Sequence, residues 1–218
     1  GISEFYIKKG GKLTFTMVHN RGEEVSVRPR TVGIVEERGV FVSNYILLKP
    51  VKSVQSFPTI FLNGPGAVAR FNSILVAPRG SYINSGNKIV LNAPETRGEI
   101  ISRAITTGGT IIAPGVIEGN AVPARGHLEC KGLILNDGVI HAIPELKGTK
   151  SGVELSHEAA VGKIAQEEIE YLMARGLDED EATSTIVRGF LNVDIMGLPG
   201  ELKESIDQTI AENEKEMF

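Results

Sequence analysis

The sequence has one cysteine, no tryptophan and no long apolar run. The single cysteine, Cys130, excludes an intramolecular disulfide and is typical of a reducing compartment. No apolar stretch approaches the roughly 20 residues that a membrane-spanning helix needs, and no signal-peptide pattern opens the chain. We therefore expect a cytoplasmic protein with no membrane partner.

Charge and motif content exclude further classes of protein. The 218 residues include 23 Lys and Arg against 27 Asp and Glu, so the net charge of −4 argues against a nucleic-acid partner. Neither Gly-rich phosphate-binding pattern, GxxxxGK[ST] or GxGxxG, is present, and HExxH and CxxC are absent too. We expect no ATP hydrolysis by the chain itself, and no enzyme of these classes.

What the sequence does contain is a long β-rich region from Leu13 to about Lys147. Short apolar or β-branched runs end at Gly, Pro, Asn or Asp, and turn clusters recur about every 8 to 14 residues. Leu13, Phe15 and Met17 alternate with threonines, as a half-buried strand requires. We predict a β domain over residues 1–150. Periodicity alone leaves a sandwich, a barrel or a solenoid open, and no strict tandem repeat is visible.

The pattern changes to helical in the C-terminal segment, residues 151–218. Ser156 suits a helix N-cap and Glu158 a first turn, and Gly176 suits a left-handed helix end. Asp178 and Glu181 have the spacing of a capping box. These signals predict helices over 157–175 and 179–190, and a third after Pro199. The apolar face of the first is formed by Val161, Ile164, Ala165, Ile169, Leu172 and Met173.

Three phrases within this segment resemble the C-terminal signature of the SufB/SufD family, the scaffold proteins of the SUF iron–sulfur cluster assembly system. They are "SHEAAVGKI", "YLMARGL" and "EATSTIVRGF", in this order, and upstream "GEIISRAITTGG" and "GHLECKGLILNDG" fit the same family. The resemblance covers about residues 10–195. It implies a right-handed parallel β-helix with C-terminal α-helices, which together with a partner protomer cover one end of the β-helix.

The resemblance also implies a function and partners. It points to a scaffold without enzymatic activity of its own, which works with a SufC-type ABC ATPase. The chain would form a homodimer or a SufB/SufD-type heterodimer. The helices would dock the ATPase, and their candidate anchors are Met173, Leu177 and Phe190.

Four residues are candidate ligands for iron or a transient iron–sulfur cluster near the dimer interface: His157, Glu158, His141 and Cys130. His157 and Glu158 match a His–Glu pair of the scaffold-type members. One thiol cannot hold a cluster, so nitrogen and carboxylate ligands would have to complete the site. His127 lies three residues from Cys130 in a predicted strand, so the two side chains should point to opposite faces. Without the resemblance, His157 and Glu158 are equally well a solvated helix start, and Cys130 a small buried residue.

Departures from the family leave alternatives open. Gly138 and Ile60 stand where scaffold-type members carry cysteine, and Ser156 stands where they often carry glutamate. The chain could therefore be a structural SufD-like partner without its own cluster, a member of a minimal branch with different ligands, or a transient iron carrier. A β-helix enzyme acting on polysaccharide is disfavoured, because few carboxylates fall in strand centres.

Overall fold

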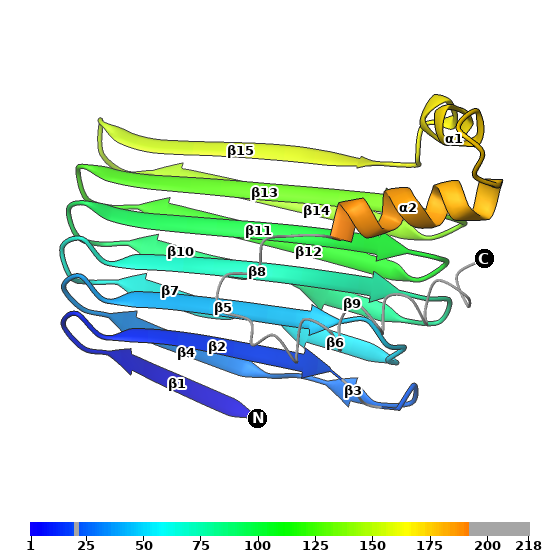
Figure 1. Cartoon of the computed structure of the whole chain (residues 1–218). Helices are drawn as coiled ribbons and strands as arrows, with labels where there is room; N and C mark the ends of the chain where they lie inside the picture. The colour runs from blue at the N-terminus through cyan, green and yellow to red at the C-terminus, as the bar shows by residue number, and fades with distance from the viewer. Residues whose placement is uncertain (20–21, 192–218) are drawn as a thin grey trace.

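The chain coils into a parallel β-solenoid built of two facing sheets (Figure 1). The computed structural model describes residues 1–19 and 22–191. Within them, sheet B holds six strands, one for each coil: β2 (Lys12–His19), β5 (Val40–Leu47), β8 (Val68–Ala77), β11 (Thr96–Thr106), β13 (Ala124–Ile134) and β15 (Val153–Gly162). The solenoid prediction is confirmed.

Sheet A forms the opposite wall. Its described strands are β1 (Ile2–Ile7), β3 (Ser26–Val27), β4 (Arg30–Val35), β6 (Ser53–Ser56), β7 (Thr59–Leu62), β9 (Tyr82–Ser85), β10 (Asn87–Leu91), β12 (Thr110–Gly119) and β14 (Val139–Gly148). The early coils cross this wall as two short strands, whereas β12 and β14 each cross it as one long strand, because β12 pairs with both β9 and β10.

Each coil takes 28 or 29 residues. In sheet B, Lys12 pairs with Val40, Val40 with Val68, Val68 with Arg97 and Arg97 with Arg125. All of these pairings are parallel, so residues one coil apart lie directly above one another. The sequence holds this period in its turns, where Asn63, Asn92 and Asn120 recur. The period escapes a search for tandem repeats because only turn and core positions share it.

The interior is a close-packed column of apolar side chains. Alternation places every second residue inside, as the burial of β12 and β13 shows. Phe5 contacts both Phe15 and Phe41, and Phe41 contacts Phe71, with ring centroids 5.0 to 6.0 Å apart. Further along the solenoid, Ile100 and Leu128 continue the same inward position and are fully buried.

The corners between sheets A and B are held by a ladder of side-chain amides. Asn92 donates to Asn63 (2.9 Å), Asn120 donates to Asn92 (3.0 Å), and Thr149 donates to Asn120 (2.9 Å). The corners at Asn63 and Asn92 then each turn through one left-handed residue: Gly66 has a φ of 70°, and Glu95 adopts 63° in the next coil. The ladder satisfies polar groups of successive coils in one run.

Two helices follow the solenoid, α1 (Gln166–Met173) and α2 (Glu179–Leu191). Val187 and Leu191 of α2 pack on Ile46, Ile74 and Ile105, which project from the outer face of sheet B. The helices therefore cover part of the side of the solenoid, near the C-terminal ends of its strands, and not its end as expected (Figure 1). The third predicted helix, after Pro199, lies outside the described residues. No described helix is long and apolar enough to cross a membrane.

Replacing Asn92 by Ala should destabilise the solenoid by about 1 kcal/mol, because it leaves Asn63 without its donor and Asn120 without its acceptor. Urea unfolding followed by circular dichroism measures the loss. Asn84→Ala is the control, since Asn84 makes no side-chain hydrogen bond to the described residues. Equal stability of the two variants would show that the ladder contributes nothing.

Candidate functional site at the open coil and the helical hairpin

The last coil, formed by β14 and β15 and called the open coil below, has an unpaired edge on each wall. Among the described strands, β14 pairs only with β12 and β15 only with β13. Both strands are ten residues long. Their inward side chains include Ile140, Leu146 and Leu155, which are only half-buried because no further coil lies above them. Long unpaired strands of this kind are templates for pairing with another chain.

The expected helix start at Ser156 is wrong, because residues 153–162 form strand β15. Val153 to Gly162 lie in register with Ala124 to Leu133 of β13, so the β-helix also extends past the expected boundary at residue 150. The pattern predicted a helix here because Val161, Ile164 and Ile169 happen to have helical spacing. In the structure they belong to β15, to the connection that follows it and to α1. Pairing with β13 outweighed local propensity here.

The strand geometry separates His157 from Glu158. Successive side chains of β15 point to opposite faces. His157 lies opposite Leu128 and faces the interior side of the open coil, while Glu158 lies opposite Glu129 on the outer face of sheet B. Both side chains are exposed. The adjacent pair therefore cannot converge on one ion within a single chain.

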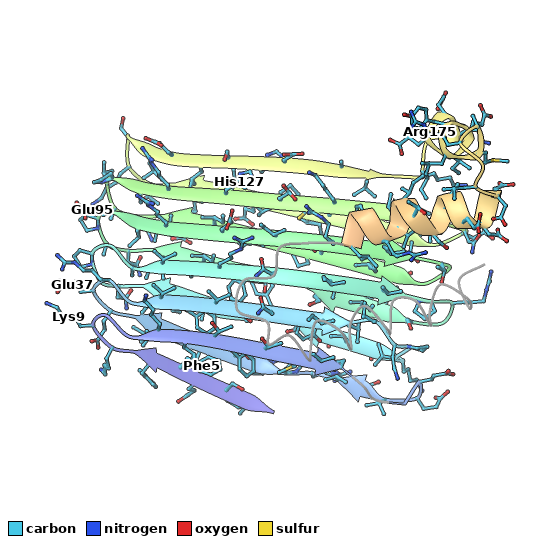
Figure 2. All side chains as sticks on the ribbon, viewed as in Figure 1. Phe5, Lys9, Glu37, Glu95, His127 and Arg175 are labelled. Atoms are coloured by element: carbon cyan, nitrogen blue, oxygen red, sulfur yellow. The ribbon has the colours of Figure 1, made fainter. Side chains whose placement is uncertain are left out.

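Cys130 faces the interior, one coil below Ala159. It is 3 % exposed, and burial together with the charge of Glu129 raises the pKa of its thiol to about 11. The thiol is therefore protonated at neutral pH and is a poor metal ligand until its proton leaves. His127 points outward (Figure 2), where its Nδ1 lies 2.9 Å from Ser156 Oγ. The expected opposite orientation of His127 and Cys130 is confirmed.

His141 lies in β14 opposite Ile112 and is exposed on the outer face of sheet A. The structure therefore brings Cys130 and His157 to the same interior side, but leaves His141 and Glu158 on opposite outer walls. His141 and His157 therefore do not meet within one chain; that they approach each other across a dimer interface stays a prediction. No group of three His, Cys, Asp or Glu side chains positioned to hold a metal ion exists among residues 1–19 and 22–191.

The two positions that the resemblance compares with cysteines, Gly138 and Ile60, do not suit a reactive thiol here. A Cβ atom added at Gly138 would overlap the side chain of Thr106. Thr106 is fixed there, because its hydroxyl donates to Gly109 O (2.8 Å). Ile60 is fully buried in the apolar core. The packing at Gly138 and the burial of Ile60 therefore account for the absence of a reactive cysteine at these two positions.

Glu158 instead ends a row of alternating charges on sheet B. Arg103 pairs with Glu129, Lys131 lies 3.5 Å from Glu129, and Lys131 lies 3.1 Å from Glu158. Burial alone would raise the pKa of Glu129, but hydrogen bonding and attraction from Arg103 and Lys131 hold it below its ordinary value. Arg103 also lies over the ring of Phe190, 5.9 Å from its centroid. Sequence reasoning missed this row, although Arg103 and Lys131 are one coil apart.

The helical hairpin, α1 and α2, confirms the predicted turn chemistry. Gly176 adopts a φ of 101° after α1. Asp178 and Glu181 form the capping box, in which Glu181 N donates to Asp178 Oδ1 (2.8 Å) and Asp178 N donates to Glu181 Oε2 (3.0 Å). The first helix is shorter than predicted because residues 157–165 are strand and turn.

The hairpin leaves an apolar groove of about 580 Å³ lined by Glu167, Glu168, Tyr171, Leu172 and Ile186. Tyr171 is 57 % exposed and Met173 41 % exposed. The guanidinium of Arg175 lies over the Tyr171 ring at 4.6 Å. Phe190, by contrast, packs against sheet B. Of the expected anchors, Met173 is accessible, Leu177 is half-buried and Phe190 is used inside the molecule.

Comparison with known proteins identifies the family of this chain. Residues 1–190 match the family model for the SufBD core domain of the SUF system of iron–sulfur cluster assembly. The chain belongs to the SufBD family.

Relatives in this family are named for iron–sulfur cluster assembly. A SufBD family protein of Archaeoglobus fulgidus is 55 % identical over the whole chain, which covers 59 % of that relative. One from Methanothermobacter thermautotrophicus (strain Winter) is 50 % identical over 93 % of the chain and 50 % of its own length. The SufB of Bacillus subtilis is 32 % identical over 96 % of the chain and 46 % of its own length. The chain thus spans about half the length of these relatives.

The charge row gives a pH-dependent prediction. Since the folded pKa of Glu129 is lowered, its ion pairs stabilise the fold above the unfolded pKa, and this stability is lost as the pH falls through the folded value. Glu129→Gln should therefore lower the free energy of unfolding by about 2 kcal/mol at pH 7, and by progressively less below about pH 4.

Urea unfolding of both proteins across this pH range measures the effect. Glu154→Gln is the matched control, because the Arg125–Glu154 pair is exposed and contributes little. If Glu129→Gln lowers the free energy of unfolding by the same amount at pH 7 and pH 3, the pKa of Glu129 is not lowered in the folded state.

Proposed function

We propose that this chain is a scaffold subunit on which iron–sulfur clusters are assembled, acting as a dimer together with a SufC-type ABC ATPase. The observation that carries the proposal is the open coil, whose two walls end in unpaired ten-residue strands. Membership of the SufBD family supplies the chemistry, and the hairpin beside the open coil supplies a surface for the ATPase.

Dimerisation through the open coil would extend both walls of the solenoid. The inward residues Ile140, Leu155 and Val161 present a half-covered apolar layer, and a second copy would bury it while pairing the free edges. A two-fold axis at this joint places the same residues of both copies against each other. A SufB/SufD-type heterodimer would use the same edges.

Ala159 and Ala160 test this joint as a matched pair. Ala159 lies above Cys130 on the inward side, and Ala160 lies above Lys131 on the outer face. We expect Ala159→Asp to convert the dimer to a monomer in sedimentation velocity, because a carboxylate buried without a partner costs on the order of several kcal/mol. Ala160→Asp should remain dimeric. Dimers in both variants would place the interface elsewhere.

Nascent cluster iron would be held at the joint and not within one chain. His157 faces the interior side of the open coil, so two copies bring two imidazoles to the interface, with Cys130 one coil deeper in each. Glu158 faces outward and is ion-paired with Lys131, so its role is structural in this arrangement. In this proposal iron and sulfide are held only until the cluster is passed on. A site with few protein ligands suits such transient binding.

Anaerobic reconstitution with ferrous iron and sulfide tests these assignments by iron content and visible absorption. We expect His157→Ala to lose most of the bound iron and Cys130→Ser to weaken its retention. His141→Ala and Glu158→Gln should keep it, since both side chains face outward. Full iron occupancy in His157→Ala, with folding verified by circular dichroism, would refute the site.

The hairpin is the proposed docking element for the ATPase. Tyr171 and Met173 are exposed apolar residues beside the groove of Glu167 and Ile186, and central apolar anchors dominate protein interfaces. Phe190 is a poor probe of this contact, because its substitution would disturb packing on sheet B.

Tyr171→Asp should abolish co-purification with a SufC-type ATPase, because the change removes an anchor and places a charge in the interface. Tyr82→Asp, on sheet A, is the control; Tyr82 is 40 % exposed and distant from the hairpin in the fold. Undiminished capture by a folded Tyr171→Asp protein would exclude the hairpin as the docking site.

A structural SufD-like subunit without its own cluster is the second candidate. It is favoured by the buried, protonated Cys130 and by the steric exclusion of a thiol at Gly138. Reconstitution separates the two functions: the structural subunit pairs through the open coil and binds the ATPase but retains no iron in any variant.

A further inference from the structure

A second cavity lies on the outer face of sheet B, at the end of the strands away from α2. It has a volume of about 780 Å³ and crosses five coils, from β5 to β15. His127, labelled in Figure 2, lies on its border. The cavity is separate from the hairpin groove, and it shares only Leu155 with the inward residues named for the dimer joint.

The floor of this cavity is apolar at one end. Val40 and Val68 occupy the same outward position in neighbouring coils, and Val42 lies two residues along from Val40. Val40 and Val68 are only half-buried and leave apolar surface in contact with water, while Val42 is buried at 7 % exposure. This half of the cavity suits a hydrocarbon or aromatic body.

Arginines follow in the next coils. Val68 pairs with Arg97, and Arg97 pairs with Arg125, so two guanidinium groups stand on adjacent strands at the same position. Arg125 lies 2.9 Å from Glu154, and Arg70 lies 3.2 Å from Glu99. Arg97 has no ion pair with any residue of the described chain. Like charges directly opposite on neighbouring strands are destabilising. The placement of Arg97 beside Arg125 therefore lowers the stability of the fold.

We propose that this cavity binds a small organic anion, with its carboxylate, phosphate or sulfonate group on Arg97 and Arg125 and its apolar body on Val40, Val42 and Val68. Guanidinium groups bind such oxyanions through paired hydrogen bonds. Strands lie about 4.8 Å apart, so the valines lie roughly 5 to 10 Å from Arg97, a distance that a body of six to eight carbons spans. The volume is that of a small-molecule site, which favours this ligand over a protein segment.

The test uses the full 218-residue chain and the fluorescent anion 1-anilinonaphthalene-8-sulfonate as probe. We expect a saturable binding phase, displaced by octanoate but not by octanol at the same concentration. Arg97→Gln should weaken this phase about tenfold, the loss of one charged hydrogen-bonding group. Val68→Thr, which keeps the shape but adds a hydroxyl, should weaken it severalfold.

Arg79→Gln is the matched control, since Arg79 is an exposed arginine at a corner outside the cavity. Circular dichroism verifies that each variant is folded. Absence of a saturable phase, or equal affinity in the wild type, Arg97→Gln and Val68→Thr, overturns the proposal. Displacement of the probe by a glutamate-rich peptide but not by octanoate also overturns it, and assigns the cavity to an acidic protein partner.

Discussion

The parallel hydrogen bonding between coils is the constraint on which the rest of this structure depends. It fixes each residue directly above its counterpart 28 or 29 positions earlier, so side chains interact in rows that run along the solenoid axis. The asparagine ladder and the pair of arginines are such rows, and the charge row joins two of them through contacts between neighbouring strands. Since every coil pairs its backbone through its neighbours, the open coil is incomplete, and the proposed dimer joint depends on this incompleteness.

The strands of the β region were predictable because alternation and turn residues agree with each other along the chain. The capping box at Asp178 and Glu181 was predictable for the same reason, as it depends on four consecutive residues. The choice of a solenoid over a sandwich came from family resemblance, since alternation is the same in both. The recurrence of Asn63, Asn92 and Asn120, 29 and then 28 residues apart, is a physical signal that favours the solenoid.

The candidate site was harder to predict, because it depends on which way a strand faces. Ser156, His157 and Glu158 read as a helix start when only their neighbours in sequence are considered. Their pairing with His127, Leu128 and Glu129, one coil earlier, is a non-local interaction that no window of local sequence contains. The same limit hid the charge row, in which Arg103, Glu129, Lys131 and Glu158 are dispersed over more than fifty positions.

The charge row has a mechanical consequence. It begins under the aromatic ring of Phe190 in α2, and it ends at Glu158 on the free edge strand. Displacing α2 along sheet B would move the Phe190 ring off Arg103 and change the surroundings of that guanidinium. Arg103 pairs with Glu129, which lies next to Lys131, and Lys131 pairs with Glu158. A partner docked on the hairpin, as proposed above, would therefore act on a row of charges that reaches the open coil, two strands away from Arg103. Work done by an ATPase on the helices would reach the edge of the solenoid through side chains, with no need for the backbone of the coils to bend.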